Sequence, residues 1–203
     1  MKFTGPIAKA SRRLGLPLTL KAARIMQQRP YPPGDHGPSK RRTTKISDFK
    51  RQLLEKQRLK WQYNVSERQL RNYVRAAVSK KENSEEALIR MLETRLDAVV
   101  LRAGFARSIY AARQFVLHGH IRVNGKWVNI PSQRVKLKDV VAVQPESQKI
   151  ESFKAAREEM VVPPPAYLNR SNEEMTVELA YLPKREEIPV SCAIQLVIEY
   201  YSR

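Results

Sequence analysis

Apolar residues recur every three or four positions through the middle of the chain, which is the spacing of one helix face. The first such run starts at Ile46, where Ser47 supplies a candidate N-cap, and a second begins at Ser66. Gln69 lies three residues after Ser66 and completes a capping box, in which two side chains satisfy free backbone amides. These signals predict two helices between residues 46 and 78.

Two further helices are predicted before the pattern changes. One begins near Ser84, carries an apolar face over about four turns and ends at Gly104, because glycine readily adopts the left-handed conformation that follows a helix. The next has Ser108 as its candidate N-cap and stops at Gly119.

After Gly119, apolar and polar residues alternate along the chain, which is typical of β-strands. Residues 120–123 alternate, Asn124-Gly125 is a strong hairpin-turn signal, and residues 126–128 form the returning strand. A third short strand is predicted at Val140–Val143. Two helices that lead into a small hairpin-based sheet form an αα-β module, so the predicted fold class is α+β, with a mainly helical domain beside the module.

The two ends of the chain lack this periodicity. Proline and glycine interrupt residues 1–45 repeatedly, and we expect a long extended arm that becomes ordered on its partner. A disordered tail is the alternative, which the apolar residues of the segment disfavour. A polar helix between residues 149 and 160, a polyproline spacer at 163–165 and an apolar C-terminus follow the module.

Together these patterns divide the chain into four segments. They are a basic arm embedded in its partner (1–45), a helical domain (46–92), the αα-β module (93–154), and a connector with a C-terminal segment that packs back on the helical domain (155–203).

The chain is strongly and unevenly basic. Its 203 residues include 38 Lys and Arg against 20 Asp and Glu, and residues 1–81 hold 21 of the basic residues against 4 acidic ones. Such a surplus implies a polyanionic partner, and basic residues in loops and helices alike fit nucleic acid better than a membrane surface. No segment approaches the ~20 apolar residues of a membrane span, and no apolar signal segment opens the chain.

Candidate chemistry other than binding is weak. The sequence has no phosphate-binding glycine loop, no dinucleotide fingerprint and no paired zinc-protease histidines, so we expect no enzymatic activity, small-molecule substrate or cofactor. The single Cys192 excludes a disulfide framework and a Cys-rich zinc site and favours the cytoplasm. His118 and His120 would bind a metal only if other ligands converged on them, and their neighbours are basic or apolar; we expect no metal.

The basic side chains are the candidate contacts to RNA, because guanidinium groups bind phosphates bidentately and stack on unpaired bases. In the module, these residues are expected to form a basic groove between the helix pair and the sheet. The alternative for single arginines is an ion pair with Glu93, Asp97 or Asp139. The full candidate set is Arg12, Arg13, His36, Lys40, Arg41, Arg42, Lys45, Lys50, Arg51, Lys56, Arg58, Arg68, Arg71, Arg95, Arg107, Arg113, His118, His120, Arg122 and Lys126.

Eight segments in order carry a family resemblance. They are Gly5-Pro6 with Ser11–Arg13, Arg29–Gly37, Ser47–Phe49, Glu55–Arg58, Ser66–Asn72, Leu92–Asp97, Ala111–Val116 with His118–Gly125, and Leu196–Arg203. With this order and spacing the chain resembles the bacterial-type ribosomal protein S-four family of the small (30S) subunit, over most of its length.

The resemblance implies a structural ribonucleoprotein component that binds 16S rRNA directly and nucleates assembly of the body of the subunit. It also implies contacts with ribosomal protein S-five and other small-subunit proteins, a position near the mRNA entry channel, and a contribution to translational accuracy. Repression of its own operon, known for some members, stays open.

The chain departs from the family pattern at three places. The N-terminal arm has no cysteine, whereas some members carry four there as a zinc site; Asp35 stands in place of the usual Gln; and Tyr167 stands in place of the usual Trp, a change expected to matter little.

Three other functions remain as alternatives. An RNA-modifying enzyme would need a separate catalytic domain, a general RNA chaperone would not need the long arm or the apolar C-terminus, and a DNA-binding helix-turn-helix would not be followed at once by a hairpin. For the run Lys40–Lys45, a nuclear localisation signal is the formal alternative.

Overall fold

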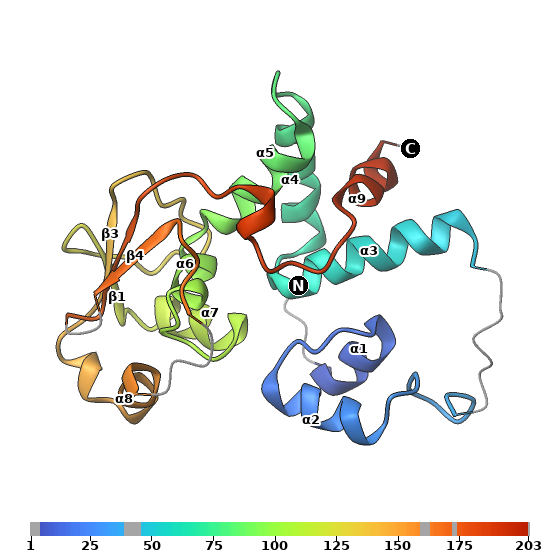
Figure 1. Cartoon of the computed structure of the whole chain (residues 1–203), viewed down its shortest axis with the longest axis horizontal. Coiled ribbons are helices and arrows are strands. Elements are labelled where there is room, and N and C mark those ends of the chain that lie inside the picture. Colours follow the sequence, from blue (N-terminus) through green and yellow to red (C-terminus); the bar gives the residue numbers. More distant parts are fainter. Residues whose placement is uncertain (1–4, 39–45, 159–162, 172–173, 203) are drawn as a thin grey trace. The chain divides into compact units, whose positions relative to one another are not determined.

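The computed structural model describes residues 5–38, 46–158, 163–171 and 174–202 (Figure 1). Within these residues there are nine α-helices, two short 3-10 helices and one five-stranded antiparallel sheet, so the α+β class is confirmed. The chain divides into two compact units, residues 1–76 with 190–203, and residues 77–189. The four-segment division at 45, 92 and 154 stays a prediction.

The expectation of an extended N-terminal arm is wrong for the described part of residues 1–45, which contains two short helices. Helix α1 (Ile7–Leu14) ends at Gly15, whose φ of 66° only glycine adopts readily. Helix α2 (Leu20–Gln28) begins where the Thr19 side chain accepts a hydrogen bond from the Ala22 amide. Proline therefore limits the length of these helices without preventing them.

The first unit is completed by three more helices. Helix α3 (Asp48–Gln62) is capped by Ser47, as predicted, and α4 (Glu67–Val78) begins with the predicted capping box, in which Ser66 and Gln69 exchange hydrogen bonds. The C-terminal helix α9 (Ile194–Tyr201) lies beside α3 (Figure 1). Between them, the amide of Gln52 donates to Glu199 at 3.0 Å.

The single helix predicted between Ser84 and Gly104 is two helices in the structure. Helix α5 (Ser84–Glu93), capped by Asn83, stops at Thr94, and α6 (Leu96–Arg102) starts after Arg95, whose backbone is extended. The reason is a backbone pairing that no local pattern contains. The Val135 amide donates to the Thr94 carbonyl, and the Leu96 amide donates to the Gln133 carbonyl. Gly104 follows with φ 75°.

Helix α7 (Ile109–Leu117) and the predicted hairpin and third strand are present. Ser108 caps the helix, and Asn124 and Gly125 both have positive φ, the conformation that a tight hairpin turn requires. The sheet has the order β2-β1-β3-β5-β4. Its strands are β1 (Ile121–Val123), β2 (Lys126–Trp127), β3 (Val140–Val143), β4 (Leu168–Ser171) and β5 (Thr176–Leu179).

Strands β4 and β5 were not predicted, and they lie in the segment interpreted as a connector. A signal existed in the alternation of Met175, Val177 and Leu179, all buried. The element between β3 and β4 is α8 (Glu151–Glu158), preceded by the 3-10 turn η1 (Ser147–Lys149); η2 (Arg185–Glu187) follows β5.

The two faces of the sheet differ in burial. Ile121, Val123, Val141 and Val143 are buried, and they alternate with Arg122 and Ala142, which are partly exposed. Because neighbouring residues of a strand point to opposite faces, one face packs into the core of the unit and the other faces solvent. In the core, α6 and α7 pack on each other (Figure 1).

Candidate nucleic-acid interface

An ion pair without solvent exposure lies at the start of α6. Arg95 donates to both carboxylate oxygens of Asp97, at 2.9 and 2.6 Å, and both side chains have 0% exposure. Arg113, from α7, lies 3.5 Å from the same carboxylate. The expectation that Arg95 lines an RNA groove is therefore corrected: its guanidinium is enclosed and pairs with Asp97, the carboxylate that also lies next to Arg113 of α7.

Arg102 is engaged in the same way. Its Nε donates to both carboxylate oxygens of Glu93 and its Nη2 to one of them. Glu93 is buried, and Tyr167 donates its hydroxyl to the same carboxylate at 3.2 Å. Burial, and then the charge of Glu93, raise the pKa of Tyr167. Tyr167 thus adds a hydrogen bond to the buried Glu93. The alternative of ion pairs with Glu93 and Asp97 holds for these arginines.

Several basic side chains that reach solvent in this module lie at the corner before α7 and around the hairpin. Arg107, His118 and Lys126 are exposed, and Arg122 is half-buried. Three further basic residues were missed by the sequence analysis: Arg134, Lys136 and Lys138 are exposed in the loop before β3. Their signal was the alternation of basic and apolar residues from 134 to 138. The basic surface of the module is centred on the hairpin and this loop.

His120 has a different environment from His118. Its ring lies 5.9 Å from that of Phe153, 6.1 Å from that of Phe115, and its Nδ1 is 2.9 Å from the Ser147 hydroxyl. Partial burial, and then the nearby His118, lower the pKa of His120. The contact of His120 with a phosphate or a base edge of RNA stays a prediction.

The hairpin is fixed to the loop that precedes β3. The Asn124 side chain donates to Asp139 at 2.8 Å and accepts from the Val140 amide at 2.9 Å, while Asp139 also accepts from the Lys136 amide. Asp139 therefore holds backbone and turn groups, and the basic residues on both segments are presented from a fixed framework.

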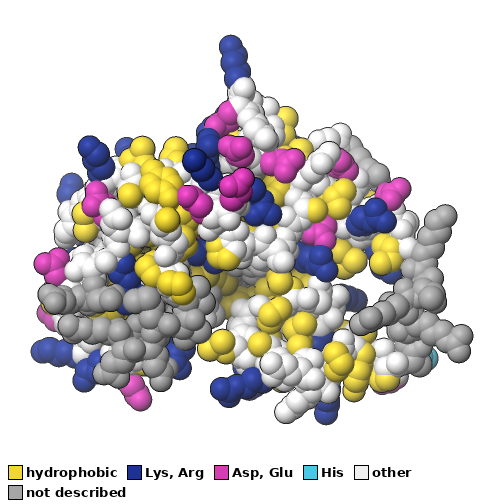
Figure 2. Space-filling model, in the orientation of Figure 1, with side chains coloured by type: hydrophobic (Ala, Val, Ile, Leu, Met, Phe, Trp, Pro, Cys, Tyr) yellow, Lys and Arg dark blue, Asp and Glu magenta, His cyan; other side chains and the backbone are white. Residues whose placement is uncertain are grey.

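In the first unit, three candidate residues have contacts within the chain. Arg12 donates to the carbonyls of Tyr31 and Pro32, and Arg58 donates to the Leu14 carbonyl and pairs with Glu55. Lys56 is 4% exposed, which corrects its assignment as an RNA contact. Exposed candidates in this unit are Arg13, His36, Lys50, Arg51, Arg68 and Arg71. Lys40, Arg41, Arg42 and Lys45 lie outside the described residues. Figure 2 shows Lys and Arg side chains over both units.

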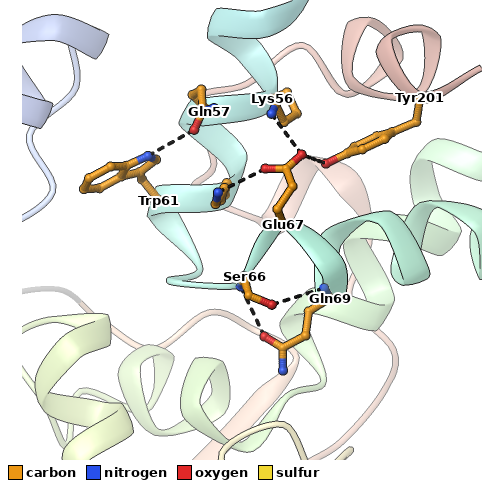
Figure 3. Close-up of polar contacts among 8 residues, drawn as sticks. Lys56, Gln57, Trp61, Ser66, Glu67, Gln69 and Tyr201 are labelled. Carbon is orange, nitrogen blue, oxygen red and sulfur yellow. Dashed lines mark hydrogen bonds and ion pairs between the residues drawn. The ribbon is translucent and has the colours of Figure 1, made fainter. Parts of the chain in front are cut away.

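Glu67 joins three helices of this unit (Figure 3). Its carboxylate accepts from Lys56 at 2.9 Å and from Lys60 at 3.0 Å, both on α3, and from the Tyr201 hydroxyl on α9 at 2.7 Å. Partial burial raises the pKa of Glu67, but the hydrogen bonds from Tyr201, Lys56 and Lys60 outweigh it and bring the pKa to about 2. The network therefore holds the C-terminal helix with an ionised Glu67.

We expect this network to lose its contribution to stability in acid. Because the pKa of Glu67 is about 2 when folded and 4.5 normally, its contribution is present above pH 4.5 and is lost as the pH falls toward 2. Solvent screening of a carboxylate that is 39% exposed limits it to about 1 kcal/mol. Urea unfolding of the wild type and Glu67→Gln at pH 7 and pH 3 measures it. A difference between the two proteins that is the same at both pH values would contradict the assignment.

Within the described ranges, no helix is both long enough and apolar enough to span a membrane. The same ranges contain no group of three or more His, Cys, Asp and Glu side chains that could hold a metal ion.

Family models match the chain in two adjacent parts. "Ribosomal protein S4/S9 N-terminal domain" matches residues 2–93, and "S4 domain" matches residues 94–141, which contain α6, α7 and the hairpin. The fold and the second match define the class: this is an RNA-binding protein built on an αα-β module, here with a helical domain before it.

Whole-chain relatives identify the family. "Small ribosomal subunit protein uS4" of Thermobifida fusca is 46% identical over the full length of both chains. Proteins of the same name from Streptomyces avermitilis and Streptomyces coelicolor are 51% and 50% identical, over 98% of this chain and 97% of theirs. The chain belongs to the uS4 family of small ribosomal subunit proteins, as the sequence resemblance predicted.

The family consists of ribosomal proteins, not enzymes, which agrees with the prediction of a non-catalytic chain. The absence of cysteine applies to the N-terminal arm and not to the whole chain. Cys192 lies before α9 in the first unit, where its thiol donates to the Glu55 carbonyl.

Proposed function

We propose that this chain is a primary rRNA-binding protein of the small ribosomal subunit, which binds 16S rRNA directly in the cytoplasmic ribosome. The observation that carries the proposal is the αα-β module of a uS4 chain with basic side chains displayed from a rigid hairpin and loop. The surplus of basic residues in residues 1–81 supports a second contact area on the helical unit.

The proposed contacts are the candidate residues that reach solvent. In the module they are Arg107, His118, Arg122 and Lys126, joined by Arg134, Lys136 and Lys138. In the helical unit they are Arg13, His36, Lys50, Arg51, Arg68 and Arg71, and the run Lys40–Lys45 remains a predicted contact. We propose that residues 1–45 lie embedded in rRNA, although their described part is helical.

Affinity in this proposal comes from phosphates, and specificity comes from the shape of folded RNA. Phosphate contacts fix register but carry little sequence information, whereas 2′-hydroxyl groups and unstacked bases distinguish one RNA fold from another. A protein that binds one RNA conformation more tightly than others shifts the population toward it. Such binding would nucleate assembly of the body of the 30S subunit.

The finer parts of the proposal rest on membership of the uS4 family and the resemblance to it. They are a contact with ribosomal protein S-five that contributes to translational accuracy, contacts with other small-subunit proteins, and proximity to the mRNA entry channel. Reconstitution of small subunits with this chain present or left out tests the assembly role. If later proteins bind equally well in both cases, the chain does not nucleate assembly.

Filter binding across a salt series tests the RNA-binding function. The chain is titrated against deproteinised 16S rRNA, with tRNA and an unrelated duplex RNA as competitors. We expect tight binding that survives both competitors, with log K falling linearly against log salt by about 0.7–0.9 for each phosphate neutralised. Equal affinity for all three RNAs would indicate a general RNA chaperone and would contradict the assembly role.

A further inference from the structure

A tryptophan on the hairpin is unusually exposed. Trp127, in the edge strand β2, has 59% of its surface accessible, the largest value among the exposed large hydrophobic residues of the described part of the chain. Burial of apolar surface favours folding, so an indole left in water at this level contributes little to the core. Its exposure needs another explanation.

The indole is nevertheless held in place from one side. Gly119 has φ 78°, and a Cβ atom at this position would overlap Nε1 and two ring carbons of Trp127. The indole therefore lies directly against the backbone of the turn between α7 and β1. A glycine is required there both by the backbone conformation and by the ring, so the position of the ring is set by the fold.

A cationic side chain stands beside this ring. Arg122 is the residue directly opposite Trp127 in the β1–β2 pairing, so both side chains stand on the same face of the sheet. Lys126 precedes Trp127 in the strand and is exposed, so it adds positive charge to the hairpin from the opposite face. An indole fixed beside a permanent cation is suited to a flat ligand that carries negative charge beside its ring.

We propose that Trp127 is a stacking platform for an unpaired base of RNA, with Arg122 on a phosphate next to that base. This inference rests on the proposed function and names the kind of RNA element that the hairpin binds. Aromatic side chains stack on unpaired bases of any sequence, and neighbouring cations follow the backbone. An apolar protein partner on this ring would instead remove the Arg122 cation from water without compensation.

Fluorescence tests the contact directly. The chain has two tryptophans, so Trp61→Phe leaves Trp127 as the single reporter. We expect its emission to be strongly quenched when 16S rRNA is added at a concentration that saturates the chain, because a stacked base quenches an indole. Emission that is unchanged at saturation overturns the proposal.

Affinity gives an independent measurement. Trp127→Ala is expected to bind 16S rRNA on the order of tenfold more weakly, and Trp127→Phe to retain most of the affinity, because one stacked base is lost in the first and kept in the second. The slope of log K against log salt stays the same in both, since no phosphate contact is removed. Ile130→Ala is the matched control, as Ile130 is 54% exposed in the same unit.

The outcomes separate this proposal from the function on which it rests. If the wild type binds 16S rRNA selectively while Trp127→Ala binds equally well, the platform is refuted, the function stands, and the ring is available to a protein partner. If the wild type shows no selectivity for 16S rRNA, both fail together. A tenfold loss with a reduced salt slope would also contradict stacking, since it would show that phosphate contacts were lost.

Discussion

Asp97→Ala is expected to lower the free energy of unfolding by about 3–5 kcal/mol, because it leaves the enclosed guanidinium of Arg95 without its carboxylate. Both side chains have no solvent exposure, and the Ala98 amide also donates to Asp97. Removing one partner of such a pair costs more than the pair itself contributes, since a buried charge remains uncompensated. Urea unfolding followed by circular dichroism measures the loss.

Glu86→Ala is the matched control for this prediction. Glu86 pairs with Arg90 at 2.9 Å, but its side chain is 43% exposed, so water replaces the lost partner and the expected change is below about 0.5 kcal/mol. Replacing both residues, Arg95→Met with Asp97→Leu, should recover part of the stability. If Asp97→Ala and Glu86→Ala lowered the free energy of unfolding by similar amounts, the buried pair would stabilise the fold no more than an exposed one.

The triple variant Arg107→Ala, Arg122→Ala, Lys126→Ala is expected to bind 16S rRNA on the order of 100-fold more weakly at 0.1 M salt, with a salt slope shallower by about 2–3. Each of these side chains reaches solvent, and urea unfolding of the variant separates a change in stability from a change in binding. A triple that included Arg95 and Arg113 would instead disturb the Asp97 site and confuse folding with binding. Filter binding across salt concentrations measures the effect.

A second triple with the same loss of charge tests whether the position matters. Lys149, Lys154 and Lys184 are exposed in the same unit, away from the hairpin in the sequence, and their replacement by alanine should weaken binding much less. Equal effects of the two triples would mean that net charge alone drives binding and that the hairpin is no specific interface.

Local signals predicted the central elements well. Ser47, Ser66 and Ser108 begin helices as expected, and Asn124-Gly125 forms the hairpin turn. These features depend on backbone amides and dihedral angles within a few residues of one another. A sequence pattern that spans five residues contains all the information that they need.

The missed helix break and the missed strand share another cause, which is contact between distant residues. The break at Thr94 depends on Val135, about forty residues away, and β5 is completed by its pairing with β3, with Val140 opposite Glu178. In the N-terminal segment, proline was read as a bar to helices, although Pro6 and Pro30 flank α1 and α2 and do not interrupt them. Proline before a helix removes no internal hydrogen bond.

The candidate interface shows the same difference between what the sequence predicts and what the tertiary structure decides. Composition predicted that basic residues would meet a polyanion, but it could not separate Arg95, which is enclosed, from Arg107, which is exposed. Both are arginines in a basic region, and the difference lies in how far the rest of the unit covers each side chain. Trp127 was not among the candidate contacts, because a tryptophan in a strand is ordinarily part of a core.

The sequence by itself determined the class and family of this protein, its central helices and its hairpin, because capping residues, turn residues and motif order are local properties. Only the tertiary structure decided where the long helix breaks, which strands complete the sheet and which cations remain for a ligand. Those outcomes depend on contacts between distant residues, in which burial turns a charged side chain into a structural partner and Gly119 holds an indole at the surface.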